Sequence, residues 1–146
     1  KGNPDTFIFP VPKVKNFDVS YSGIKTAFLN LLNNKISKNP NFIKENLNDL
    51  CASIQKTLVK IIIQKIEKAK KSLKINSIVV GGGVAANSEI RRVLKDKSLT
   101  DNWEVFLPPF QYTTDNAAMI GIVGYHALKE KKLGKMNQSV NPRLAF

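Results

Sequence analysis

The sequence has 146 residues, of which 42% are hydrophobic and 23% charged, and its formal net charge is +12. This length and composition are typical of one globular domain. They exclude a disordered or fibrous protein, and the single cysteine, Cys51, excludes a disulfide framework.

The charge favours an anionic partner such as a nucleic acid. However, 20 of the 23 basic residues are lysines scattered along the chain, a pattern that more often marks a solvated surface. The lone cysteine is typical of a reducing compartment, so we expect a cytoplasmic protein. No apolar run reaches the roughly 20 residues of a membrane span, so no membrane contact is expected. A start at Lys1 without a signal pattern predicts a piece of a longer protein.

The first half of the chain is expected to be mainly helical. Three prolines among residues 4–12 predict an extended lead-in that lies on the surface. Alternating apolar residues predict a strand over 17–21, and a helix is expected after Gly23. Apolar residues at steps of three and four then predict a long amphipathic helix over about 41–71, with Cys51 in the core.

The second half alternates strands with helices. A β-branched run over 76–80 predicts a buried parallel strand, and a helix is expected after Asn87. A second strand is expected over 103–109. The last helix, over 113–132, is expected to begin at a Thr or Asp cap and to end with Lys and Gly134. This alternation predicts the α/β class.

The stretch IVVGGGVAAN carries the first candidate site. Gly81, Gly82 and Gly83 leave backbone N–H groups open beside the positive end of a helix dipole, an arrangement that suits a phosphate or nucleotide. The run is neither GxGxxG nor a P-loop. From local sequence alone, a tight turn with Asn87 as an ordinary N-cap is therefore the simpler interpretation.

Two further segments carry polar candidates. Asp115, in TTDNAAMIG, stands near the expected start of the last helix, where its carboxylate either caps the helix or ligates a cation. Ser20 and Ser22 flank Tyr21 before the first helix, where their hydroxyls either cap that helix or contact a ligand.

Four segments in order, GNPDTFIFP, FDVSYSGIKT, IVVGGGVAANSEIRRVL and TTDNAAMIG, resemble the bacterial tRNA threonylcarbamoyladenosine-forming family. This family was formerly labelled O-sialoglycoprotein endopeptidase or glycoprotease. The resemblance covers nearly the whole chain and implies an actin-like, ribonuclease H-like ATPase fold built of two related halves. Residues 1–146 are expected to be mostly the second half. The first half, with its HxxxH motif, is absent from this chain.

The resemblance also implies a reaction and the residues that serve it. The family transfers threonylcarbamoyl from threonylcarbamoyl-adenylate to N6 of the adenosine next to the anticodon, and AMP leaves. Asn87, Gly82 and Gly83 are implied to bind the nucleoside part of the adenylate or of ATP. Asp115 is implied to ligate one divalent metal ion, Fe or Zn, together with histidines of the absent half. No residue of this chain is expected to act as a nucleophile.

The implied partners are tRNA and helper proteins of the same pathway, among them a paralogous dimerisation partner. The chain alone is expected to be inactive. Because a single half leaves an apolar face uncovered, it is also expected to self-associate. The implied site further requires Asn87 and Asp115 to face one common cleft.

Three alternative functions stay open. A nucleotide-binding or dimerisation module without catalysis is one. The presence of Asp115 argues against it for the longer protein, whereas the absence of the first half argues for it in this chain. A carbohydrate kinase of the actin-like superfamily shares the glycine turn, but it has no use for a metal-ligating Asp at that helix start. The former peptidase label is the third, and no HExxH, Ser–His–Asp or Cys–His set supports it.

Overall fold

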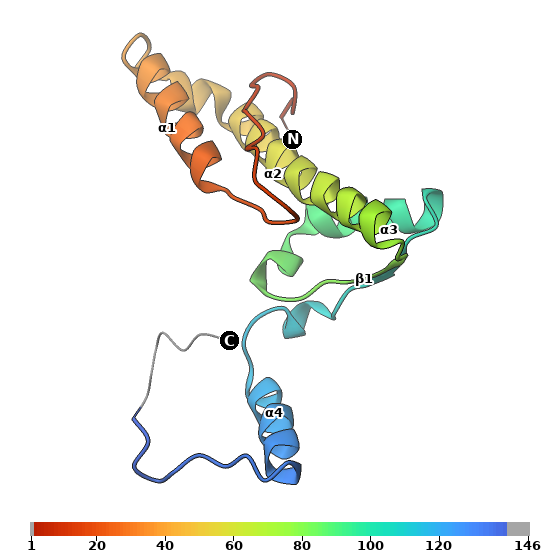
Figure 1. Ribbon diagram of the computed structural model, residues 1–146. Helices are drawn as coiled ribbons and strands as arrows, with labels where there is room; N and C mark the ends of the chain where they lie inside the picture. Colours follow the sequence, from red (N-terminus) through yellow and green to blue (C-terminus); the bar gives the residue numbers. More distant parts are fainter. Residues whose placement is uncertain (1, 140–146) are drawn as a thin grey trace.

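A computed structural model describes residues 2–139 of the chain (Figure 1). These residues form helices, two short strands and two 3₁₀ turns, which confirms the α/β class. Within residues 2–139, no helix is both long enough and apolar enough to cross a membrane. The elements in chain order are α1 (Ser22–Ile36), α2 (Phe42–Leu73), β1 (Ser77–Val79), η1 (Gly83–Ala86), α3 (Ser88–Thr100), β2 (Glu104–Phe106), η2 (Phe110–Tyr112) and α4 (Ala117–Lys129).

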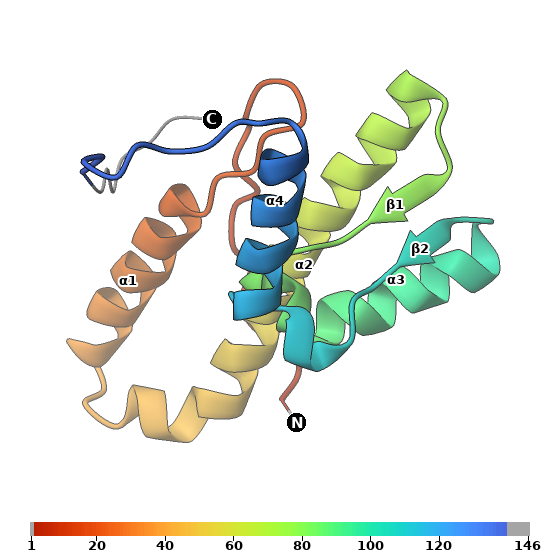
Figure 2. The ribbon, with the colours of Figure 1, turned by 90° about the horizontal axis from the view of Figure 1, so that it is seen from below.

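The two strands form a parallel pair connected by α3 (Figure 2). Their register places Ser77 opposite Glu104 and Val79 opposite Phe106. Because the strands are parallel, their carboxyl ends lie at the same edge of the sheet, and the segments that follow both strands leave from that edge. This edge therefore carries the glycine turn after β1 and the loop that leads from β2 to α4.

The hydrophobic core lies on one face of this sheet. In Figure 1, α2 and α3 lie above the strands and α4 lies below them. The buried cluster joins side chains of α2 and α3 to Trp103, which precedes β2. The other face is open, since Val79 is 81% and Phe106 is 50% exposed. The expectation of a buried strand is therefore wrong, because nothing in the described chain covers the second face. The cluster consists of Val59, Ile63, Ile90, Leu94 and Trp103.

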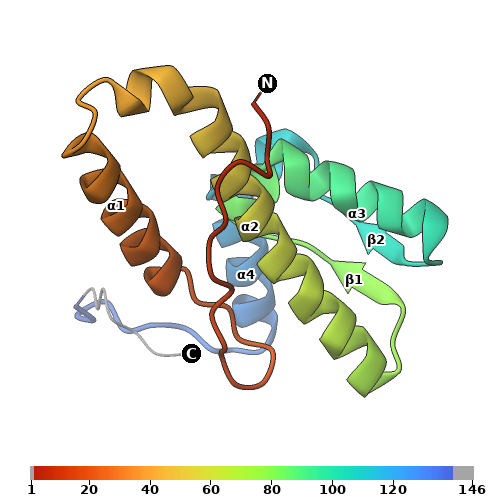
Figure 3. The same cartoon turned by 90° about the horizontal axis from the view of Figure 1, so that it is seen from above.

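The lead-in is extended and lies on the surface as expected, and the structure places it along α2. The Asn3 backbone N–H and the Thr6 hydroxyl donate to the Asp49 carboxylate, at 2.8 and 2.9 Å. Farther along, the Lys65 ammonium donates to the Val14 and Asn16 carbonyls, at 2.8 and 3.1 Å. Figure 3 shows this segment crossing the face of α2, beside α1. The polar groups of one helix thus replace the backbone partners that a segment rich in proline does not provide itself.

Three expectations for the first half are wrong. Residues 17–21 form no strand, because no neighbouring strand in the described chain takes their backbone hydrogen bonds and Phe17 and Val19 stay 40% exposed. The helix begins at Ser22, before Gly23. Cys51 is exposed rather than in the core, since it lies one residue beyond the stripe on which Leu50 is buried.

Candidate functional site

The glycine turn after β1 differs in one respect from the expected direct entry into a helix. Gly82 has φ of +80°, in the left-handed region that favours glycine, and the 3₁₀ turn η1 then precedes α3. A Cβ added at Gly82 or Gly83 would meet no atom within 4 Å. The backbone here is thus open to approach by a ligand.

Asn87 is the N-cap of α3, as local sequence predicted. Its Oδ1 accepts hydrogen bonds from the backbone N–H of Glu89 at 3.0 Å and of Ile90 at 3.1 Å. These bonds satisfy two donors that the first turn of a helix leaves unpaired. The amide nitrogen of Asn87 has no hydrogen-bond partner within the described chain, so capping uses one end of the side chain and leaves the other end available.

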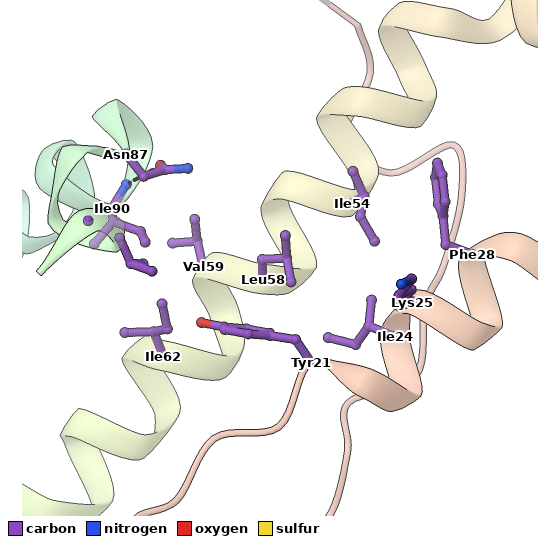
Figure 4. A pocket seen from close by; sticks show the side chains of 12 residues that line it. Tyr21, Ile24, Lys25, Phe28, Ile54, Leu58, Val59, Ile62, Asn87 and Ile90 are labelled. Atoms are coloured by element: carbon purple, nitrogen blue, oxygen red, sulfur yellow. Dashed lines mark hydrogen bonds between the residues drawn. The ribbon is translucent and has the colours of Figure 1, made fainter. Parts of the chain in front are cut away.

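A cavity of about 570 Å³ opens beside this cap, between α1, α2 and the glycine turn (Figure 4). Its size is that of a small-molecule pocket. Most of its walls are apolar, and Asn87 supplies a polar group at one end. Of the glycines implied as ligands, Gly83 lines the cavity and Gly82 does not. The lining residues are Tyr21, Ile24, Lys25, Phe28, Ile54, Leu58, Val59, Ile62, Gly83, Val84, Asn87 and Ile90.

Tyr21 brings a second polar group to this cavity. Figure 4 shows its ring lying across the space between α1 and α2, with the hydroxyl toward Ile62. Burial raises the pKa of this hydroxyl, so at neutral pH it stays protonated and able to donate a hydrogen bond. The neighbouring Ser20 and Ser22 hydroxyls lie 3.0 Å from each other, and neither caps α1.

Asp115 does not cap the last helix, which corrects the sequence-based interpretation. The cap of α4 is Asn116, whose Oδ1 accepts from the Met119 backbone N–H at 3.2 Å. The Asp115 carboxylate is exposed and does not line the cavity beside Asn87, so the cleft that these two residues were expected to share is not found at this cavity. Asp115 is therefore free of the structural role that local sequence favoured.

The end of α4 also differs from expectation. Lys131 adopts φ of +56° and its N–H donates to the Leu128 carbonyl at 3.1 Å, while Lys132 donates to the Ala127 carbonyl at 2.9 Å. This pair of bonds is a Schellman motif. Gly134 therefore lies beyond the residue that ends the helix.

Arg91 is a residue of this region that sequence reasoning did not single out. Its guanidinium donates to the Ala85 carbonyl in η1 at 3.0 Å and to the Pro108 carbonyl after β2 at 2.8 Å. One side chain thus ties together the segments that follow the two strands. The sequence feature that could have identified it is its residue type. Arginine is rare in this chain, and its planar guanidinium can donate to two acceptors at once.

A sequence model of the family described as tRNA N6-adenosine threonylcarbamoyltransferase matches residues 1–122. The chain belongs to this family. It is 44% identical to the tRNA N6-adenosine threonylcarbamoyltransferase of Christiangramia forsetii over 146 residues, which are 100% of this chain and 43% of that protein.

Other members of the tRNA N6-adenosine threonylcarbamoyltransferase family match the chain with similar identity and coverage. The relative from Riemerella anatipestifer is 39% identical over 97% of this chain and 42% of its own length. The relative from Porphyromonas gingivalis is 45% identical over 86% of this chain and 37% of its own length. The chain thus spans about two fifths of the length of these relatives.

Proposed function

We propose that this chain is part of an enzyme that transfers a threonylcarbamoyl group from threonylcarbamoyl-adenylate to N6 of the adenosine next to the anticodon of a tRNA. The observation that carries the proposal is the cavity between Asn87, the glycine turn and α1, in a chain that the family model matches over residues 1–122. The nucleoside part of the adenylate, or of ATP, occupies this cavity. Asn87 and Gly83 hold its polar edge, and Gly82 keeps the turn open.

The fold proposed for the whole protein is the actin-like, ribonuclease H-like ATPase fold, with this chain as mostly its second half. Two observations support it. The chain spans 43% of the Christiangramia forsetii relative. The described residues also place a glycine turn at the carboxyl end of a parallel strand, the edge at which α/β sheets bind ligands.

The proposed reaction depends more on positioning the two substrates than on a nucleophilic side chain. The adenosine N6 forms a bond to the carbamoyl carbon, the bond from that carbon to the phosphate oxygen breaks, and N6 loses a proton as AMP leaves. An exocyclic amine is a weak nucleophile, so holding both substrates in a reactive geometry contributes much of the rate. A walled cavity beside Asn87, whose side chain is held in place by the two hydrogen bonds that cap α3, suits that task.

A divalent metal ion, Fe or Zn, is part of the proposal for the longer protein. Within residues 2–139, no group of three His, Cys, Asp or Glu side chains is arranged to hold a metal. Asp115 alone offers one carboxylate, whereas zinc in proteins takes three or four ligands. The described residues therefore do not fit a metal ion by themselves.

The chain alone is accordingly expected to bind Zn²⁺ no more tightly than its Asp115→Asn variant. Competition with a chromophoric zinc chelator measures this, and addition of EDTA should leave the melting temperature unchanged. Tight binding that depends on Asp115 would contradict this account of an incomplete site.

The remaining proposals concern partners and surroundings. Three predictions remain: tRNA as a partner, helper proteins of the pathway that include a paralogous dimerisation partner, and a cytoplasmic location. So does self-association, which two features support. None of the residues of α4 is buried in the described chain, and the outer face of the sheet is open. A non-catalytic module and the former glycoprotease label remain the competing functions.

A chimera tests the enzyme proposal. This chain replaces the matching segment of the Christiangramia forsetii relative, and transfer of threonylcarbamoyl to unmodified tRNA is assayed. We expect transfer by the chimera and a loss of at least about a hundredfold with Asp115→Ala, the size of effect typical of losing one group that supports the transition state. A Lys71→Gln chimera is the matched surface control. Full transfer by the Asp115→Ala chimera would show that Asp115 is not part of the active site.

A further inference from the structure

A second hollow borders the segment that carries Asn87. It measures about 410 Å³ and is lined by Ala86, Ser88, Arg91, Arg92, Lys95 and Phe110. Four of these residues recur along α3 at steps of three and four, so they form one stripe of that helix. The stripe lies apart from the core positions Ile90 and Leu94 of the same helix.

Phe110 gives this hollow an exposed aromatic wall. The ring is 68% exposed and pairs with no other ring in the described chain, so it adds little to the core. Its backbone is nevertheless held in place. The Thr113 hydroxyl and backbone N–H both donate to the Phe110 carbonyl, at 2.8 and 3.2 Å, and Thr113 is 2% exposed. A rigid turn thus presents an aromatic face to solvent.

The charges around the ring are positive. Arg92 is neutralised by Glu89 and Asp96, each 2.6 Å away. Lys95 is exposed and has no ion pair within the described chain, and Arg91 contacts only backbone carbonyls there. The hollow therefore combines one aromatic face with two cations that no carboxylate offsets.

This combination points to an unpaired nucleic-acid strand. Proteins hold single strands by stacking bases on aromatic side chains and by placing cations along the phosphates. We propose that the hollow binds an unpaired segment of RNA, with one base stacked on Phe110 and a neighbouring phosphate contacting Lys95. The choice of RNA rests on the proposed function, in which a tRNA is the acceptor.

The position of the hollow fits this role. Gly83, Val84, Asn87 and Ile90 line the first cavity, whereas Ala86, Ser88 and Arg91 line the second. The two spaces thus border the same short segment. A strand bound at Phe110 brings its neighbouring nucleotides close to the cavity proposed for the adenylate.

Fluorescence anisotropy with the full 146-residue chain tests the proposal. The probes are a fluorescein-labelled stem-loop RNA with an unpaired loop and a fully paired RNA duplex of equal length. We expect Phe110→Ala to weaken stem-loop binding about tenfold and Phe110→Tyr to retain it, since stacking needs only the ring. The duplex should bind the parent chain more weakly than the stem-loop.

Matched variants distinguish a specific phosphate contact from nonspecific attraction between the positive protein and RNA. Lys95→Gln should reduce the slope of log affinity against log salt by about 0.7, the value for one lost phosphate contact to a single strand. Lys71→Gln on α2 removes the same charge and Leu99→Ala removes another exposed side chain of α3. Neither control should change binding. Equal stem-loop affinity of the parent and Phe110→Ala, or an equal loss with Lys71→Gln, overturns the proposal.

Nucleotide binding on the same samples separates this inference from the proposed function. Phe110→Ala should bind ATP as the parent does. If the chain binds nucleotide but no RNA, the hollow is not an RNA site, and the proposal that the first cavity binds a nucleoside is still supported. If RNA binding depends on Phe110 but the chimera transfers nothing, the enzyme proposal fails and the RNA surface stands.

Discussion

Replacing Leu94 with alanine is expected to lower the free energy of unfolding by about 3 kcal/mol. Leu94 is 0% exposed and packs in the cluster with Val59, Ile63 and Trp103. Truncation removes buried methyl groups and leaves a cavity between α3, α2 and the sheet. Because small domains are stable by only about 5–15 kcal/mol, this change is a large share of the total.

Urea titration followed by tryptophan fluorescence measures the effect, since Trp103 is the only tryptophan and belongs to the same cluster. Leu99→Ala is the matched control. It lies on the same helix, loses the same atoms and is 85% exposed, so its expected change stays within about 0.5 kcal/mol. Equal losses from both variants would mean that α3 is not packed as described.

Replacing Asn87 with serine is expected to weaken nucleotide binding about tenfold while leaving stability nearly unchanged. Serine keeps a capping oxygen for the N–H groups of Glu89 and Ile90, and serine and asparagine cap about equally well. It lacks the amide nitrogen that the structure leaves unpaired. The expected loss corresponds to one hydrogen bond whose acceptor on the ligand is left without a partner.

Asn87→Ala is the companion variant. It should lose nucleotide binding to the same extent and should also lose about 1 kcal/mol of stability, since no side chain then caps α3. Calorimetric titration with ATP and thermal melts measure the two quantities separately. Undiminished binding by the serine variant would leave Asn87 as a helix cap alone.

Local pattern predicted the helices well. The apolar period placed α2 at about 41–71, and the structure has it at Phe42–Leu73. A helix was also predicted after Asn87, and α3 follows it at Ser88–Thr100, with Ile90 and Leu94 buried. Helices are predictable in this way because their backbone hydrogen bonds close within the segment itself.

Strand 17–21 was predicted by the same kind of reasoning and is absent. A strand depends on a neighbour for its hydrogen bonds, so alternation alone does not ensure that one forms. The prediction of the residue that caps α4 was wrong for a related reason. Asp115 and Asn116 are both good capping residues, and local preference did not distinguish between them.

The order of residues in the chain was enough to specify the α/β class, the helix that follows Asn87 and the family to which the chain belongs. Three features depended on packing: the cavity between α1, α2 and the glycine turn, the double contact of Arg91, and the hollow beside Phe110. Each joins segments far apart in the sequence. Their relative placement follows from which apolar faces bury one another, and no local pattern encodes that choice.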